Sequence, residues 1–148
     1  MRKNNLAALA NMMNVYENNY KQLIQLVPDV DVKRLILTSA NDGLANVQID
    51  VLERCKYTTF LKLTHFLGSN DGMIPHLTMK LRVYHDAKLA EVIDSQNQSQ
   101  FKAVNDYPNK KMHHTYEKRQ INLFFGDWLT HCIKNEYSLL HVEDLTNV

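Results

Sequence analysis

Cysteine, glycine and proline are all scarce in this chain of 148 residues, which contains two cysteines, four glycines and three prolines. Cys55 and Cys132 have neither metal-ligand nor redox spacing, so we expect reduced thiols in a reducing compartment and no disulfide scaffold. The low glycine and proline content excludes collagen-like and low-complexity chains. No apolar run approaches the roughly 18 residues that a membrane span needs. We therefore expect a cytoplasmic protein without membrane contact.

An excess of either charge is also missing. Lysine and arginine number 17 and aspartate and glutamate 16, which gives a net charge of +1. This balance provides no overall attraction to nucleic acid or to anionic membranes. With 45% hydrophobic residues the composition is that of an ordinary globular protein. A chain of this length buries roughly 70% of the surface of its unfolded state, so we expect a single domain over residues 1–148.

Hydrophobic periodicity predicts helices near both ends and strands between them. Residues 6–27 carry apolar side chains at alternating intervals of three and four, and Pro28 should end this helix. Residues 35–38 and 47–51 flank an Asn-Asp-Gly turn and predict a hairpin, followed by strands near 57–66, 77–84 and 88–93. Residues 68–72 indicate a loop, and residues 101–104 indicate a short additional strand.

A second amphipathic helix closes the sequence, with Ile121, Phe125, Trp128, Leu129 and Cys132 on its apolar stripe. Strands in one central run with short connections favour an antiparallel sheet. Two flanking helices cover such a sheet most simply from one side. The predicted fold is therefore α+β: an antiparallel sheet of about five strands with an N-terminal and a C-terminal helix packed on one face.

The densest polar chemistry lies in residues 107–129, where a Tyr-Pro-Asn-Lys-Lys segment precedes the Glu-Lys-Arg-Gln-Ile-Asn start of the closing helix and its Asp-Trp-Leu end. This run resembles the signature of the YqiB-like bacterial family of unknown function. Residues 12–20, 54–59 and 77–92 are also similar to that family. The resemblance covers most of the chain, but it implies no settled reaction, cofactor or ligand.

We expect a binding or regulatory module for an anionic small molecule or nucleotide, centred where residues 107–122 enter the closing helix. Lysines would receive the anionic group, amides would supply hydrogen bonds, and the turn that follows the strand at 77–84 would border the site. The candidate residues are Tyr84, His85, Asp86, Tyr107, Asn109, Lys110, Lys111, His114, Glu117, Lys118, Gln120 and Asn122. We name no cofactor and no catalytic residue.

Lys118 falls on the apolar stripe of the closing helix, where an unpaired ammonium group would be costly to bury. Three interpretations follow: an ion pair between the two helices, with Glu17 as one partner; a ligand pocket; or a solvated helix end. His114 lies one turn earlier, and with His113 and Glu117 it shares a helix face. These three residues lack a zinc-binding pattern, so we expect no metal site.

Residues 102–119 contain five basic and two acidic side chains, a local charge of +3. Tyrosines lie among these charges, and the strand residues Phe60, Lys62, Lys80, Arg82 and Tyr84 could extend the surface. Basic and aromatic groups together hold phosphates and stack bases, so a nucleotide or RNA is one interpretation. A solvated sheet face and a protein interface are the others. The sequence has no glycine-rich phosphate loop, which argues against nucleoside triphosphate hydrolysis.

Two alternatives to a binding module remain. A small hydrolase of a phosphorylated metabolite would use His85 or His114 as acid and base and Lys118 as electrostatic stabiliser, which requires the three side chains to share one pocket. A homodimer would instead use the sheet face that carries Phe60 and Tyr84.

Overall fold

The computed structural model describes residues 2–27, 32–42, 45–69, 72–96 and 110–144. Their order along the chain is α1 (Arg2–Leu26), β1 (Val32–Thr38), the short 3-10 helix η1 (Ala40–Asp42), β2 (Asn46–Arg54), β3 (Thr58–Ser69), β4 (Gly72–Tyr84), β5 (Leu89–Gln96), α3 (Lys110–Lys134) and β6 (Ser138–Asp144). The predicted α+β class with one antiparallel sheet is confirmed. Within these residues the sheet has six strands in the order β5-β4-β3-β2-β1-β6, where about five were predicted.

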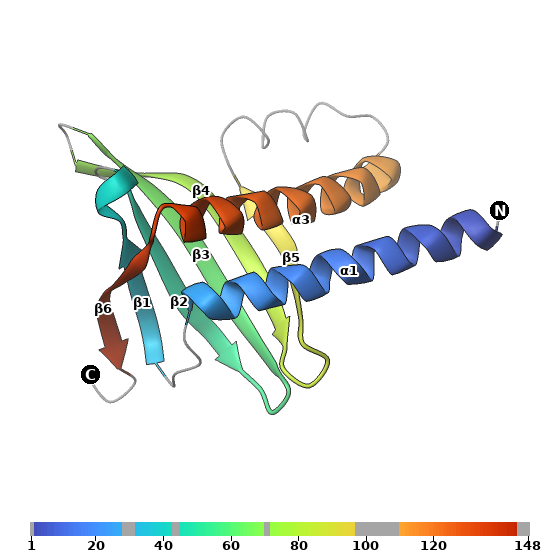
Figure 1. The fold of residues 1–148 in the computed structure, drawn as a ribbon, viewed down its shortest axis with the longest axis horizontal. Helices are drawn as coiled ribbons and strands as arrows, with labels where there is room; N and C mark the ends of the chain where they lie inside the picture. The colour runs from blue at the N-terminus through green and yellow to red at the C-terminus, as the bar shows by residue number, and fades with distance from the viewer. Residues whose placement is uncertain (1, 28–31, 43–44, 70–71, 97–109, 145–148) are drawn as a thin grey trace.

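Both helices lie across one face of the sheet, as predicted, and Figure 1 shows them running side by side over the strands. The core fills the layer between helices and sheet. From the helices it receives Leu23, Phe125, Trp128 and Leu129, all buried. The strands contribute alternate residues, among them Leu63, Met79 and Leu81, which have no measurable exposure. This alternation places the intervening polar residues of β3 and β4 on the opposite face.

The sixth strand is the main difference from the sequence prediction. After α3, Glu136 adopts a left-handed conformation with φ of 57°. The Glu136 and Tyr137 amides donate to the carbonyls of Ile133 and Cys132, so the helix ends in a Schellman turn. The chain then reverses into β6, which pairs with β1. Glutamate stands where a glycine usually marks such a turn, so the strand could not be recognised from the residues before it.

Other differences concern the lengths of elements. The predicted loop at residues 68–72 is wrong in part, because β3 continues to Ser69 and β4 begins at Gly72. Likewise β5 runs on to Gln96, three residues beyond the end of the strand predicted near residues 88–93. The turn predicted at residues 85–87 is confirmed, and Lys88 completes it with a φ of 59°. The short strand predicted at residues 101–104 lies outside the described residues.

Candidate functional site

An apolar pocket lies between the C-terminal half of α1 and the inner face of the sheet. Its volume is about 70 Å³, room for several water-sized groups or a short aliphatic chain. The apolar walls come from α1 and from the first four strands: Tyr20, Leu23, Ile24, Val27, Val32, Leu35, Ile49, Val51, Leu61 and Val83. Ile24, predicted to continue the buried stripe of α1, is 48% exposed and lies at the border of this pocket.

Three polar side chains complete the lining: Arg54, Thr59 and His85. Arg54 and Thr59 are direct partners across the β2–β3 pair. The hydroxyl of Thr59, which is buried, lies 2.6 Å from Nε2 of His85. The His85 amide donates to the carbonyl of Tyr57, which fixes the turn after β4 against the β2–β3 turn. The pocket is therefore apolar along its length and polar where these turns meet.

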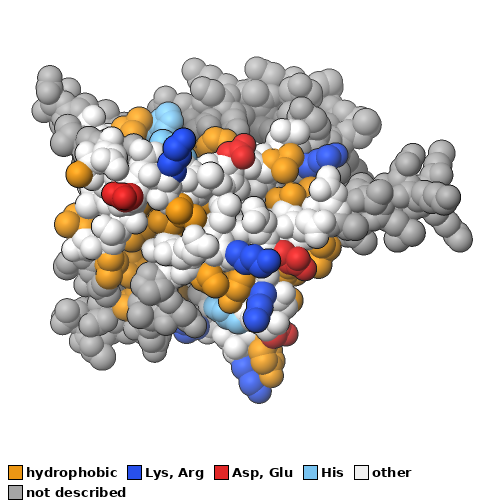
Figure 2. Space-filling model, in the orientation of Figure 1, with side chains coloured by type: hydrophobic (Ala, Val, Ile, Leu, Met, Phe, Trp, Pro, Cys, Tyr) orange, Lys and Arg blue, Asp and Glu red, His pale blue; other side chains and the backbone are white. Residues whose placement is uncertain are grey.

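Charged residues of both signs lie in or beside the two turns at this polar end. Lys56 lies in the β2–β3 turn and Lys88 in the β4–β5 turn, and both are exposed, as are the acidic Glu53 and Asp86. Figure 2 shows basic and acidic side chains, with a histidine among them, in the lower part of the molecule, where Figure 1 places these turns. Asp86 accepts a hydrogen bond from the Ala87 amide, so its carboxylate is partly used within the turn.

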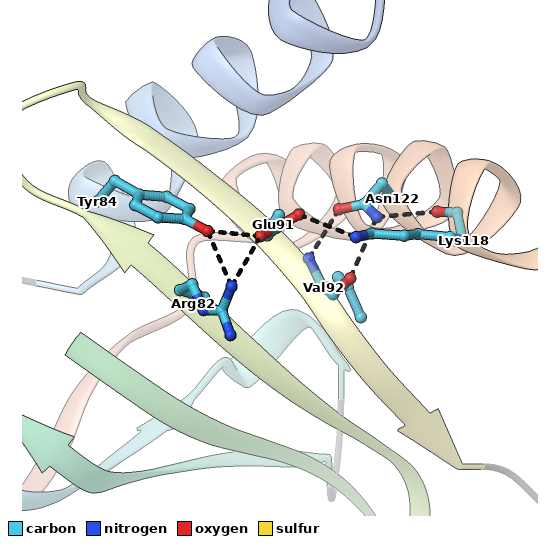
Figure 3. A network of polar contacts seen from close by, with 6 residues as sticks. All are labelled: Arg82, Tyr84, Glu91, Val92, Lys118 and Asn122. Atoms are coloured by element: carbon cyan, nitrogen blue, oxygen red, sulfur yellow. Dashed lines mark hydrogen bonds and ion pairs between the residues drawn. The ribbon is translucent and has the colours of Figure 1, made fainter. Parts of the chain in front are cut away.

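A second polar group, the Glu91 cluster, joins β4, β5 and α3 (Figure 3). Glu91 is 9% exposed and accepts a 2.8 Å hydrogen bond from the Tyr84 hydroxyl. Lys118 Nζ lies 3.3 Å from the other carboxylate oxygen, and Arg82 Nη1 lies 3.7 Å from the oxygen that Tyr84 contacts. Two cations and a hydroxyl therefore surround one largely buried acid, which satisfies its charge.

Asn122, a predicted ligand-binding residue, is fully buried and has a different environment. Its side-chain oxygen accepts a 2.7 Å hydrogen bond from the Val92 amide, and its side-chain nitrogen donates to the carbonyls of Val92 and Lys118. Val92 lies on β5, the strand at one edge of the sheet, where the outward-facing backbone groups have no neighbouring strand as a partner. The Asn122 side chain therefore forms with Val92 the hydrogen bonds that a neighbouring strand would form.

The structure brings together some of the predicted site residues and separates others. Tyr84 and Lys118 meet at Glu91, whereas His85 is on the helix side of the sheet, in the apolar pocket. The predicted partner of Lys118 was Glu17, but the ion pair is formed with Glu91. Gln120 is exposed on α3. Tyr107 and Asn109 lie outside the described residues, as do the side chains of four helix residues: Lys110, Lys111, His114 and Glu117.

Sequence reasoning did not identify the polar residues Arg54 and Thr59 of the pocket lining, or Glu91 at the centre of the Glu91 cluster. Glu91 was predicted only as part of a strand, although an acid between Ala90 and Val92 in a buried strand indicates a partner nearby. Arg54 and Thr59 gave no comparable sign, because polar residues at strand ends are usually solvated. Among the described residues, no three His, Cys, Asp or Glu side chains lie close enough to hold a metal ion. No described helix is long and apolar enough to cross a membrane.

The model of a family described as a protein of unknown function (DUF1249) matches residues 22–138. The chain belongs to the DUF1249 family. The uncharacterized protein YqiB of Escherichia coli K12 is 38% identical over 125 residues, which cover 82% of this chain and 86% of YqiB. YqiB of the O157:H7 strain matches equally well. The predicted membership of a YqiB-like family is thus confirmed. No solved structure matches the chain.

The matched segment of the DUF1249 model includes the pocket residues from Leu23 onward and the whole Glu91 cluster. YqiB carries no described activity, so the match brings no substrate, partner or catalytic residue to this chain. The chemistry of the site has to be inferred from its geometry.

The Glu91 cluster also affects a tyrosine on α1. Burial raises the pKa of the half-buried Tyr16 hydroxyl above its ordinary value of 10.0, and the negative charge of Glu91 raises this pKa further. Lys118 lowers the pKa of Tyr16 and Tyr84 raises it, and both effects are smaller than that of Glu91. The folded protein therefore holds this hydroxyl protonated at a pH where the unfolded chain has begun to lose the proton.

We expect Tyr16 to make the protein less stable in alkali. Above pH 10 the unfolded chain binds fewer protons at this position than the folded protein, so the free energy of unfolding falls as pH rises towards the folded-state pKa. Urea unfolding of wild type and of Tyr16→Phe at a series of pH values measures this contribution. The wild type should lose more stability than the variant above pH 10. Identical pH dependence in the two proteins would show that folding does not raise the pKa of Tyr16.

Proposed function

We propose that the protein is a ligand-binding module whose pocket takes a small molecule with an apolar body and an anionic group. The observation that carries this proposal is the pocket itself, with apolar walls between α1 and the sheet and Arg54, Thr59 and His85 at one end. Ligand sites are typically concave and largely apolar, with a few polar groups that fix the orientation of the ligand.

The polar end of the pocket favours an anion. Arg54 is one of the lining residues, and a guanidinium group has the geometry to hold a carboxylate or phosphate. Thr59 and His85 add a hydroxyl and an imidazole, which can donate hydrogen bonds to the same group. The apolar walls account for the other part of the ligand, because burying a methylene group contributes about 0.8 kcal/mol.

The hydrolase alternative has less support. It requires His85, His114 and Lys118 in one pocket, and the structure places His85 against Thr59 and Lys118 against Glu91. The lining of the pocket includes His85 but not Lys118. A binding module needs no such convergence, since a single polar end and an apolar body are sufficient.

Straight-chain carboxylates test the proposed function. Purified full-length protein would be titrated with butanoate, hexanoate and octanoate, and with the matching alcohols, while the melting temperature is recorded. A carboxylate present at about 100 times its dissociation constant stabilises the folded state by roughly 2.7 kcal/mol, equivalent to about 5–10 °C. Because a pocket of about 70 Å³ admits only a short chain, we expect butanoate and hexanoate to give this shift, octanoate to give no more than hexanoate, and the alcohols to give less.

Variants at the two ends of the pocket separate the contribution of the apolar walls to binding from that of the polar end. Val51→Phe should remove the response to every chain, because the half-buried Val51 lines the apolar part of the pocket and the larger ring fills it. Arg54→Gln should abolish the preference for carboxylates over alcohols. Lys134→Ala removes a charge from an exposed position on α3 and serves as the control. If Val51→Phe responds like the wild type, the pocket is not the site.

A further inference from the structure

The outer face of the sheet carries a row of charged residues, one on each of the six strands in the described parts of the chain. In the paired register, Glu143 of β6 lies opposite Arg34, Arg34 opposite Asp50, Asp50 opposite Lys62, Lys62 opposite Lys80 and Lys80 opposite Asp94. From β6 to β5 the signs along the row are therefore minus, plus, minus, plus, plus, minus. Neither described helix covers this face, because both lie on the other side of the sheet.

Lys62 and Lys80 break the alternation of charge. Side chains directly opposite each other in an antiparallel pair have Cβ atoms about 4.5–5.5 Å apart, and like charges at such positions are destabilising. Both lysines are exposed, and neither forms a hydrogen bond or ion pair with any residue in the described parts of the chain. Each lysine also has an acid opposite it on its other side, Asp50 for Lys62 and Asp94 for Lys80, but neither ammonium group forms an ion pair with that acid.

The other charges of this face are largely paired within the protein. Arg34 contacts Asp50 at 2.6 Å, and Asp50 also accepts a 3.0 Å hydrogen bond from Gln48. Arg82 and Lys118 surround Glu91. Glu53 lies opposite Phe60 on the same face, and Asp94 lies opposite Lys80. Lys62 and Lys80 are the two adjacent positive residues of the row, and both are exposed.

Flat groups lie in the next row of the same face. Phe60 is directly opposite Arg82, and the guanidinium carbon of Arg82 is 5.1 Å from the centre of the Phe60 ring. The same carbon lies 5.9 Å from the Tyr84 ring, so Arg82 is between two aromatic side chains. Aromatic rings and arginine guanidinium planes are the groups on which proteins stack the bases of single-stranded nucleic acids.

We infer that the outer face binds single-stranded RNA, with Lys62 and Lys80 contacting backbone phosphates and the Phe60–Arg82 pair stacking a base. An extended strand is a better fit than a free nucleotide. A small ligand needs a concave site that buries most of its surface, whereas a single strand gains affinity from successive contacts along an open face. This site is independent of the apolar pocket, which lies on the other side of the sheet.

Fluorescence anisotropy with a labelled oligouridylate of about 12 nucleotides tests the inference at about 50 mM salt. We expect the double variant Lys62→Ala/Lys80→Ala to bind at least about tenfold more weakly than wild type. The slope of log affinity against log salt should also become shallower by about 1.4, since each phosphate contact on a single strand contributes about 0.7. Phe60→Leu should weaken binding while the salt slope stays unchanged, because stacking releases no counterions.

Two controls connect the result to this face. Lys134→Ala removes the same charge on the helix side and should bind like wild type. Arg54→Gln should also bind normally, so failure of the pocket proposal leaves this result unaffected. The inference is overturned if wild type fails to bind the oligonucleotide at low salt, or if the double lysine variant binds as tightly as wild type. It is equally overturned if light scattering shows a dimer that the lysine substitutions dissociate but the oligonucleotide leaves intact, because the face would then be a dimer interface.

Discussion

Replacing Asn122 with alanine is expected to lower the free energy of unfolding by about 2–4 kcal/mol, because each buried polar group that loses its hydrogen bond costs about 1–3 kcal/mol. The Val92 amide and the Val92 carbonyl would both lose their partner. The Lys118 carbonyl would lose its contact with the side chain as well. Asn122 is fully buried, so water cannot replace these bonds without a change in packing.

Hydrogen exchange at the Val92 amide is the most direct readout. In wild type this amide should exchange slowly even though β5 is an edge strand, since the Asn122 side chain accepts its hydrogen. In Asn122→Ala it should exchange much faster than the other amides of β5 that are paired with β4. Gln120→Ala removes an exposed amide group two residues earlier on α3 and should change stability by less than about 0.5 kcal/mol.

Asn122→Asp refines this test. The carboxylate can still accept a hydrogen bond from the Val92 amide, but it cannot donate to the carbonyls of Val92 and Lys118. We expect it to destabilise the fold as well, because a charged group would be buried beside two carbonyl oxygens. If both variants keep wild-type stability and slow exchange at Val92, then Asn122 does not hold the sheet edge and is available for a ligand, as the sequence suggested.

Periodicity predicted the layers of this fold well because burial depends directly on it. The alternation of residues 77–84 placed Leu81 in the core and Arg82 on the outer face, where the structure has them. The stripe of α3 placed Phe125 and Trp128 in the core, where they are 0% and 7% exposed. These residues obey rules of spacing alone, so no knowledge of the neighbouring elements was needed.

The candidate site was harder to predict, because its polar residues depend on contacts between distant segments. The environment of Asn122 is set by Val92, 30 residues earlier in the chain. His85 is paired with Thr59, 26 residues away, across the meeting point of two turns. Spacing within one helix could place Lys118 and Asn122 one turn apart on α3, but it could not show that Asn122 contacts the edge of the sheet and Lys118 a buried acid.

The hydrogen bond of Trp128 could not be predicted from spacing either. Its indole nitrogen donates a 3.1 Å hydrogen bond to Nδ1 of His65, a buried residue of β3. This bond requires the proton of a neutral His65 ring to be on Nε2, so the histidine acts as part of the core. The apolar stripe predicted that Trp128 is buried, but the partner of its polar atom belongs to a strand 63 residues away.

A second large effect on stability is expected for a substitution at Gly126, where α3 crosses α1. A Cβ atom at this position would lie 2.8 Å from Oδ1 of Asn19, closer than such atoms normally approach. Asn19 is 1% exposed and its side-chain nitrogen donates to the carbonyl of Asn122, so it can move away only by giving up this bond. Gly126→Ala should therefore destabilise the protein by about 1–3 kcal/mol, the usual cost of overpacking.

A double-mutant cycle separates this contact from the intrinsic preference of the helix. Alanine is favoured over glycine inside a helix by about 0.8–1.0 kcal/mol, so Gly126→Ala should become stabilising once Asn19→Ala has removed the clash. Urea unfolding of the four proteins measures the change of sign. If Gly126→Ala stabilises the protein with Asn19 still present, then Asn19 yields freely and the helices do not meet as tightly as the structure shows.

The crossing also bears on the proposed pocket. Asn19 is followed directly by Tyr20, the first α1 residue of the pocket lining, so a shift of α1 at the contact with Gly126 would also move this wall of the pocket. We expect Gly126→Ala to weaken the binding of hexanoate in addition to reducing stability, because the wall must shift to make room for the methyl group. In the Asn19→Ala background the same substitution should leave hexanoate binding nearly unchanged. A loss of stability without any change in binding would show that the helix crossing and the pocket wall move independently.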